Sequence, residues 1–176
     1  MTLKNHPAKT IWLTGLSGSG KTTLSKELQD LFILHNIQLI RLDGDELRSG
    51  LNNDLGFSEE DRSENIRRVA HLSKILNKQG YWTIVALITP LNNQRKLART
   101  IVGENFISVY LNCPLEICEQ RDVKGLYKEA RKGNVKNFTG ISHNFEIPDY
   151  SELIIDTNKS DVHQSVLLVL EFLKNG

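Results

Sequence analysis

The sequence has few of the features that stabilise small extracellular domains or span a bilayer. Its 176 residues include two cysteines, Cys113 and Cys118, which are too few for a disulfide framework and are best interpreted as buried free thiols. No apolar run reaches the length of a membrane-spanning helix, and residues 1–9 lack the apolar core of a signal peptide. We therefore expect a cytoplasmic protein without a membrane partner.

Charge of one sign is also not in excess. The 22 Lys and Arg residues nearly balance the 21 Asp and Glu residues, which leaves a net charge of +1. No overall field therefore favours binding to nucleic acid or to a membrane surface. The five histidines are scattered without the spacing of metal ligands. With 39% apolar and 24% charged residues, the chain is expected to form one domain over residues 1–176.

One stretch carries a specific binding motif. Residues 15–22 read G-L-S-G-S-G-K-T and match the phosphate-loop pattern G-x-x-x-x-G-K-[ST] at every defined position. A β-prone run precedes the motif, and leucines at helical spacing follow it. In that context the loop amides bind phosphate oxygens, Lys21 reaches the β- and γ-phosphates of a nucleotide, and Thr22 binds Mg²⁺. A glycine-rich surface turn is the less favoured alternative, because residue types, spacing and context agree.

Apolar β-prone segments alternate with helical patterns along the chain. Strands are expected over 10–14, 38–42, 82–88, 106–111 and 153–155, and helices over 23–32, 58–79, 90–102, 114–121 and up to about residue 173. This alternation predicts an α/β P-loop NTPase fold with a five-stranded, mainly parallel, doubly wound sheet. Ligands of such sheets bind beyond the carboxyl ends of the strands. The phosphate loop, Asp43–Asp45, Thr89–Pro90 and Asn112–Cys113 are therefore expected to converge on one cleft.

A long polar segment over residues 122–150 interrupts the alternation. Six basic residues and two acidic ones lie between residues 121 and 136, a local charge of 6 − 2 = +4. In a phosphate-loop protein, such a segment is typical of a mobile lid that closes over phosphates and excludes water. A disordered insertion, a solvated surface and a weak nucleic-acid patch are the alternatives.

Two aspartates follow the second strand and would face opposite ways if the backbone stayed extended. Phosphoryl transfer needs a group that orients or deprotonates the attacking hydroxyl, and a carboxylate near the metal's water shell. We assign Asp45 to the first role and Asp43 to the second. Because Asp-Gly is common turn chemistry, a turn cap is the alternative for each.

Arginines follow the aspartates and suit anion binding, because a guanidinium binds phosphate or sulfate through two donors. Arg62 falls in the first turn of the helix that begins near residue 58 and should lie close to the cleft. For Arg67 and Arg68, an anion-binding role and a solvated helix face are both open.

Residues 158–161 favour another class of protein, because N-K-S-D matches the guanine-recognition pattern of P-loop GTPases. However, no D-x-x-G switch motif lies between the phosphate loop and the third strand. We interpret the match as a chance resemblance in a loop that lines the nucleotide base, and keep a GTP-dependent switch as an alternative.

These motifs together resemble the adenylylsulfate kinase family over about residues 10–156. Residues 42–52 resemble the family's L-D-G-D-N-x-R-x-G-L-N segment, and residues 55–68 match its L-G-F-S-x-x-D-R-x-x-N-x-R-R. Residues 118–127 and 136–141 match the two ends of the family's lid. The resemblance implies transfer of a phosphoryl group from ATP, with Mg²⁺, to the 3′-hydroxyl of adenosine 5′-phosphosulfate, and it suggests a homodimer.

The resemblance also implies a role for each matching residue, with Phe57 and Phe138 stacking on the acceptor's adenine. The complete set is as follows: catalytic Asp45, Lys21 and Thr89; ATP-binding Gly15, Leu16, Ser17, Gly18, Ser19, Gly20, Lys21, Thr22, Thr23 and Arg121; acceptor-binding Asp45, Arg48, Asn52, Phe57, Arg62, Asn65, Lys124 and Phe138; metal-binding Thr22 and Asp43.

The chain departs from the family pattern in two segments. Residues 86–92 read A-L-I-T-P-L-N, where the family commonly has S-F-I-S-P, then an aromatic residue or His, then Arg. Thr89 stands where the family has a phosphorylatable serine, and direct in-line transfer from ATP explains the chemistry without a phosphoenzyme. Asn92 replaces an arginine, and Glu46 and Ser49 replace the usual asparagine and the frequent histidine. These changes leave open a related kinase that acts on another nucleotide-like acceptor.

Overall fold

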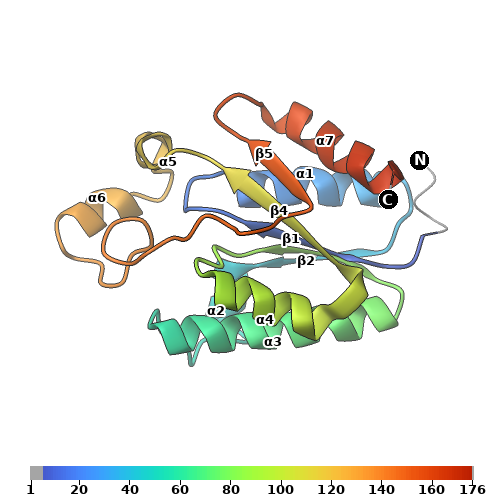
Figure 1. Ribbon diagram of the computed structural model, residues 1–176, viewed down its shortest axis with the longest axis horizontal. Coiled ribbons are helices and arrows are strands. Elements are labelled where there is room, and N and C mark those ends of the chain that lie inside the picture. Colours follow the sequence, from blue (N-terminus) through green and yellow to red (C-terminus); the bar gives the residue numbers. More distant parts are fainter. Residues whose placement is uncertain (1–5, 176) are drawn as a thin grey trace.

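The computed structural model describes residues 6–175, and five strands form one parallel sheet in the order β2-β3-β1-β4-β5 (Figure 1). The strands are β1 (Thr10–Thr14), β2 (Leu39–Asp43), β3 (Trp82–Ala86), β4 (Phe106–Asn112) and β5 (Leu153–Asp156). In register, Thr10 of the central strand pairs with Thr83 on one side and with Phe106 on the other. The predicted doubly wound parallel sheet is confirmed.

Helices connect the strands and cover both faces of the sheet. They are α1 (Lys21–Leu34), α2 (Gly44–Ser49), α3 (Glu59–Lys78), α4 (Asn92–Val102), the 3₁₀ turn η2 (Gly103–Asn105), α5 (Leu115–Arg121), α6 (Leu126–Arg131) and α7 (Val162–Asn175). No helix in this part of the chain is long and apolar enough to cross a membrane.

Two hydrophobic layers result from the alternation of side chains along the strands. Ile11 and Leu13 point to one face, where they pack with residues of α1 and α7. Trp12 points to the opposite face and packs with residues of α3 and α4. All five residues of β1 are buried, as expected for a central strand covered on both sides.

The long helix α3 begins at the predicted residue. Ser58 is its N-cap, and the Ser58 hydroxyl accepts a hydrogen bond from the backbone N–H of Asp61 at 3.1 Å. Ile66, Val69 and Ala70 lie on its buried face. This helix covers the sheet and places its first turn near the carboxyl ends of the strands.

The chain after β2 does not stay extended but turns into helix α2 at Gly44. The alternation of side chains along a strand therefore does not determine how Asp43 and Asp45 face. Asp43 is the N-cap of the short helix α2, and its Oδ1 accepts a hydrogen bond from the backbone N–H of Asp45 at 3.0 Å. Asp43 therefore caps the first turn of α2 through one of its two carboxylate oxygens. Asp45 lies in the first turn of α2 instead of continuing the strand.

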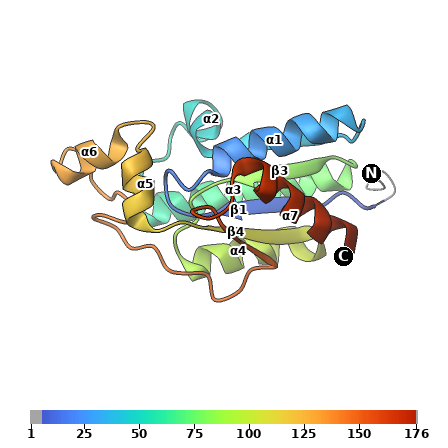
Figure 2. The same cartoon turned by 90° about the horizontal axis from the view of Figure 1, so that it is seen from above.

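The segment over residues 122–150 packs around a small hydrophobic core that it shares with α5 and the phosphate loop. It contains α6, and Tyr127, Ala130, Phe138 and Thr139 within it are buried. In both views α5 and α6 lie together beyond one end of the sheet (Figures 1 and 2). We call residues 122–150 the lid.

Candidate active site

A cavity of about 810 Å³ lies beyond the carboxyl ends of the strands, between the phosphate loop and the lid. Its volume is at the upper end of the range of roughly 300–1,000 Å³ that is usual for ligand sites. The phosphate loop, Asp43–Asp45 and Thr89–Pro90 all line it, as the sequence predicts. The prediction was wrong for Asn112–Cys113: Leu111 lines the cavity, whereas Cys113 packs into the core of the lid, which also buries Cys118.

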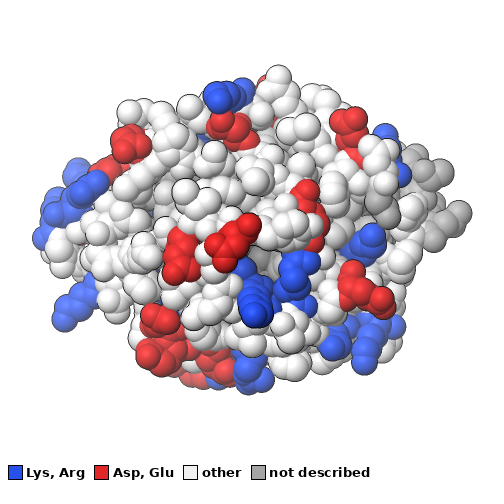
Figure 3. Space-filling view, viewed as in Figure 1, with Lys and Arg blue, Asp and Glu red and all other residues white. Residues whose placement is uncertain are grey.

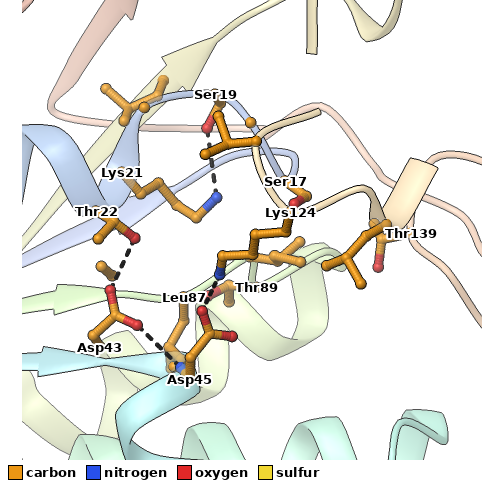
Figure 4. A pocket seen from close by; sticks show the side chains of 18 of the residues that line it. Ser17, Ser19, Lys21, Thr22, Asp43, Asp45, Leu87, Thr89, Lys124 and Thr139 are labelled. Atoms are coloured by element: carbon orange, nitrogen blue, oxygen red, sulfur yellow. Dashed lines mark hydrogen bonds and ion pairs between the residues drawn. The ribbon is translucent and has the colours of Figure 1, made fainter. Parts of the chain in front are cut away.

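The phosphate loop encloses its own lysine. Lys21 Nζ donates hydrogen bonds to the carbonyl oxygens of Gly15 at 2.9 Å and Leu16 at 2.7 Å, and contacts Ser19 Oγ at 3.5 Å (Figure 4). Burial lowers the pKa of Lys21 to about 8. The present partners of the Lys21 ammonium are neutral carbonyl oxygens. Anionic phosphate oxygens in the loop would bind it more strongly than these carbonyls do.

The other ATP-binding candidates are distributed around this loop. Residues 17–23 line the cavity, as does Arg121. Gly15 forms the tight turn out of β1, where a Cβ atom would lie 2.8 Å from the carbonyl oxygen of Leu111. Leu16 points away from the cavity into the core of the lid.

Thr22 and Asp43 form a pair of oxygen ligands at the base of the loop. Thr22 Oγ1 donates a hydrogen bond to Asp43 Oδ2 at 2.9 Å, which joins the start of α1 to the end of β2 (Figure 4). Mg²⁺ at nucleotide sites takes a few protein oxygens and completes its shell with water and phosphate. The hydroxyl and carboxylate fit this ion, and the described residues contain no cluster of three or more His, Cys, Asp or Glu side chains that suggests another metal.

Asp45 faces the cavity from the first turn of α2 and forms an ion pair with Lys124 of the lid (Figure 4). Both side chains are more than half exposed, at 70% for Asp45 and 52% for Lys124. Such a pair contributes little to stability and exchanges readily with a ligand.

Thr89 lies beside the cavity with a strained backbone. Its φ angle is +46°, which is rare for a β-branched residue, and its side chain is buried. The indole N–H of Trp12 donates a hydrogen bond to Thr89 Oγ1 at 2.9 Å. This bond fixes the direction of the threonine hydroxyl, and strain of this kind is typical of functional sites.

Another part of the cavity wall is built around Phe57, which is 55% exposed. The guanidinium of Arg48 lies 4.5 Å from the centre of the Phe57 ring, and that of Arg62 lies 5.5 Å away. Arg62 also donates hydrogen bonds to the backbone carbonyls of Phe57 at 3.2 Å and Asn137 at 2.8 Å. Burial, together with nearby Arg48, lowers the pKa of Arg62 to about 10.

Asn65 also lines the cavity, but Asn52 does not. Asn52 is fully buried, and its Nδ2 donates a hydrogen bond to Asn65 Oδ1 at 2.8 Å. Asn52 therefore orients Asn65 instead of facing a ligand, because it lies behind the cavity wall. Phe138 lines the cavity from the lid.

Basic residues of the lid divide into two groups. Lys124 and Lys136 line the cavity, as does Arg121 at the end of α5, whereas Arg131 and Lys132 form surface ion pairs with Glu119 and Glu129. The face drawn in Figure 3 carries basic and acidic side chains interspersed, without a large area of one sign. The surface group accounts for part of the lid's local positive charge.

Two further arginines, for which the sequence left anion binding open, lie on a solvated face of α3. Arg67 pairs with Glu64, and Arg68 pairs with both Asp54 and Glu64. Neither arginine lines the cavity, so the solvated-face interpretation is confirmed for both.

The N-K-S-D segment has a structural explanation. Asp161 Oδ1 accepts a hydrogen bond from the backbone N–H of Gln164 at 2.8 Å, and Gln164 Oε1 accepts one from the N–H of Asp161 at 2.9 Å. This reciprocal cap at the start of α7 occupies the carboxylate that a GTPase would use for guanine.

Three departures from the family pattern lie outside the cavity wall, namely Glu46, Ser49 and Asn92, whereas those at Ala86, Leu87 and Thr89 line it. Asn92 ties α4 to the downstream end of the lid, because its Nδ2 donates to Asp149 Oδ1 at 3.0 Å. The departures at Glu46, Ser49 and Asn92 therefore do not change the cavity lining directly.

Sequence reasoning did not single out Tyr127 or Thr139, both of which line the cavity. Tyr127 lies within the K-G-L-Y run and Thr139 follows Phe138, so the motifs contained them. Their burial depends on contacts with residues far away in the sequence, which motif spacing does not reveal.

Known proteins share this arrangement. The family model for adenylylsulphate kinase matches residues 7–156. An adenylyl-sulfate kinase of Bacteroides thetaiotaomicron is 50% identical over 164 residues, which cover 93% of this chain and 82% of that protein. One from Clostridium kluyveri is 47% identical over 165 residues, with the same coverage of each chain.

A solved structure agrees with these relatives. The Mycobacterium tuberculosis APS kinase CysC in complex with AMPPNP and APS superposes with a TM-score of 0.92 at 39% identity, covering 96% of this chain and 98% of that one. Sequence, fold and cavity lead to the same assignment: the chain belongs to the adenylylsulphate kinase family.

Proposed function

We propose that this protein transfers the γ-phosphoryl group of ATP to the 3′-hydroxyl of adenosine 5′-phosphosulfate (APS), which gives 3′-phosphoadenosine 5′-phosphosulfate and ADP. The observation that carries the proposal is one cavity with two different sides. A phosphate loop lines one side, and the other is lined by Asp45, Phe57 and Phe138. Its members match the family's motifs residue by residue.

The donor side holds ATP. Lys21 leaves the carbonyls of Gly15 and Leu16 and binds the β- and γ-phosphates, where its charge stabilises the transferring group. Thr22 would hold Mg²⁺ directly, with Asp43 next to its water shell. When bound, this ion neutralises charge on the phosphates.

On the acceptor side, Phe57 and Phe138 stack on adenine, which suits aromatic rings that face a cavity. Arg48 and Asn65 bind the phosphosulfate and ribose. Arg62 donates hydrogen bonds to the backbone carbonyls of Phe57 and Asn137 and so links the two segments that carry the stacking rings. Its remaining N–H groups bind the phosphosulfate.

The reaction proceeds by in-line displacement. Asp45 accepts the proton of the 3′-hydroxyl while the 3′-oxygen bonds to the γ-phosphorus and the bond from that phosphorus to the β,γ-bridging oxygen breaks. Lys124 must leave Asp45 for this to occur, because the two form an ion pair. The Thr89 hydroxyl, oriented by Trp12, hydrogen-bonds the reacting phosphate without itself becoming phosphorylated.

A related kinase with another nucleotide-like acceptor is the second candidate. The departures at Glu46, Ser49 and Asn92 do not argue against APS, because these residues do not line the cavity. A cytoplasmic location and a homodimer stay predictions from the sequence. The solved structure named a hexameric APS kinase from Thiobacillus denitrificans shows that a relative assembles into oligomers.

Coupled measurement of ADP or GDP release tests the proposal, with ATP or GTP and with or without APS. We expect turnover with ATP that depends on APS. Turnover of GTP without an acceptor would contradict the proposal. ATP turnover stimulated by another adenosine nucleotide but not by APS would favour the second candidate.

A further inference from the structure

The phosphate loop, helix α5 and the lid share one hydrophobic cluster. Leu16 from the loop packs there with Cys118 of α5, Tyr127 of α6, and Phe138. The fit is close, since a Cβ atom on Gly140 would lie 3.1 Å from Leu16 Cδ2. The lid therefore rests on the phosphate loop through packed side chains.

Tyr127 is the member of this cluster that touches both sides of the cavity. Its side chain is only 1% exposed, and its hydroxyl donates a hydrogen bond to the backbone carbonyl of Ser17 at 2.9 Å. Its ring contacts Phe138 edge-to-face, with centroids 4.9 Å apart and planes at 78°. Burial raises the pKa of the Tyr127 hydroxyl, which keeps it protonated as a donor.

The hydrogen bond to Ser17 also fixes an amide that binds phosphate. A trans peptide is planar, so holding the Ser17 carbonyl also holds the N–H of Gly18 in the opposite direction. Loop N–H groups of this kind bind phosphate oxygens. Gly18 also packs closely against α5, because a Cβ atom there would lie 2.8 Å from the Cys118 carbonyl oxygen.

Asp122 fixes the position of Tyr127 itself. The Asp122 carboxylate accepts hydrogen bonds from the backbone N–H groups of Tyr127 at 3.0 Å and Lys128 at 3.1 Å. These bonds hold the backbone at the start of α6, from which the Tyr127 side chain extends. Tyr127 is thus a direct link between Phe138, which its ring contacts, and the phosphate loop, which its hydroxyl contacts.

We propose that Tyr127 is a positioning residue that couples the two nucleotide sites, so that binding of the acceptor tightens binding of ATP and the reverse. This inference rests on the proposed function, because it takes Phe138 as the wall on which the acceptor's adenine stacks. Stacking fixes the Phe138 ring, which fixes Tyr127, which orders the Ser17–Gly18 peptide. Linkage makes the effect equal in both directions.

The test measures binding of AMPPNP with Mg²⁺ by titration calorimetry, with and without saturating APS, in the wild type and in Tyr127→Phe. The variant removes only the hydroxyl and keeps the ring. Couplings between sites are typically about 5–150-fold, so we expect APS to tighten AMPPNP binding at least about fivefold in the wild type. In Tyr127→Phe this ratio falls below about twofold, while binding of AMPPNP alone weakens by up to about fivefold, the value of one hydrogen bond.

Tyr110→Phe is the matched control. Tyr110 is buried, donates its hydroxyl to Asn112 Oδ1 at 3.2 Å and stacks on Phe145, but it does not line the cavity. Its coupling ratio should equal that of the wild type. An unchanged ratio in Tyr127→Phe, an equal loss in Tyr110→Phe, or no coupling in the wild type would overturn the proposal.

Hydrogen exchange of the wild type gives a second measurement that needs no variant. AMPPNP alone should protect amides of residues 122–140, and APS alone should protect amides of residues 15–22. Protection confined to each nucleotide's own segment would overturn the coupling. Failure of the proposed function has a different signature, namely no APS-dependent ADP release from the wild type.

Discussion

Lys124 of the lid forms an ion pair with Asp45 at the start of α2. The carboxylate proposed to accept the substrate's proton is thus held by a lid cation before the acceptor binds. Because both side chains are exposed, the pair contributes little to the free energy of folding. In the proposed reaction, the acceptor's hydroxyl would therefore replace Lys124 as the partner of Asp45 at low energetic cost.

Asp45→Asn should lower turnover by about 10²-fold or more, because an amide cannot accept the proton in general-base catalysis. Binding of AMPPNP should change little, since Asp45 lies on the acceptor side. Steady-state ADP release and calorimetry measure the two effects. Glu60→Gln is the control, because this exposed carboxylate lies outside the cavity wall and its loss should leave turnover within about twofold. Nearly unchanged turnover in Asp45→Asn would show that Asp45 is only a positioning or turn residue.

Phe57→Ala should weaken the acceptor selectively. Stacking of a base on an aromatic ring contributes about 1–3 kcal/mol, so the KM for APS should rise roughly 5- to 150-fold while the KM for ATP stays nearly constant. Tyr150→Ala is a matched control: Tyr150 is also exposed and lies 5.3 Å from an arginine, Arg99, but not in the cavity. An equal loss of ATP affinity in Phe57→Ala would contradict the stacking role.

Lys21 should take up a proton when ATP binds at alkaline pH. Its pKa is about 8 without ligand, and anionic phosphates raise it. At pH 8.5 most free protein has neutral Lys21 and most complex has the charged form, so binding takes up roughly half a proton or more. At pH 6.5 both forms are charged and uptake vanishes. Calorimetry of AMPPNP with Mg²⁺ in two buffers of different ionisation enthalpy measures the uptake, with Lys26→Met, an exposed lysine of α1, as the control. Binding heats that do not depend on the buffer at pH 8.5 would argue against this assignment.

Thr89→Val should lower the melting temperature, because it leaves the buried indole N–H of Trp12 without its acceptor. An unsatisfied buried donor costs about 1–3 kcal/mol, which corresponds to a decrease of roughly 3–10 °C in a chain of this size. Thr89→Ser keeps the hydroxyl and relieves the β-branched side chain at positive φ, so it should melt near the wild type and retain activity. Equal melting temperatures for the valine and serine variants would show that the Trp12 bond contributes nothing.

The strands and long helices could be predicted because local patterns determine them. The continuous apolar run from Trp82 indicated a buried parallel strand, and Ser58 with Asp61 indicated the start of α3. Strand β3 nevertheless ends at Ala86, two residues before the predicted end, because the chain turns into the strained conformation of Thr89. Propensity does not reveal a conformation that tertiary contacts impose.

Site residues could be predicted where a sequence motif determines their role. They could not be predicted where the role depends on a contact with a residue far away in the sequence. Lys21 and Thr22 follow from the phosphate-loop pattern alone. The role of Tyr127 depends on Ser17, which lies 110 residues earlier, and Asn52 lies behind Asn65 because of a buried side-chain hydrogen bond. Helix α2 was missed because Asp-Gly-Asp is equally compatible with an open turn.

The central claim is that one cavity transfers a phosphoryl group from ATP to the 3′-hydroxyl of a second nucleotide. Its most direct test is ADP release with three acceptors: APS, its 2′-deoxy analogue and its 3′-deoxy analogue. We predict turnover with APS and with the 2′-deoxy compound, and none above the acceptor-free rate with the 3′-deoxy compound. Turnover of the 3′-deoxy compound at the rate of APS would contradict the account.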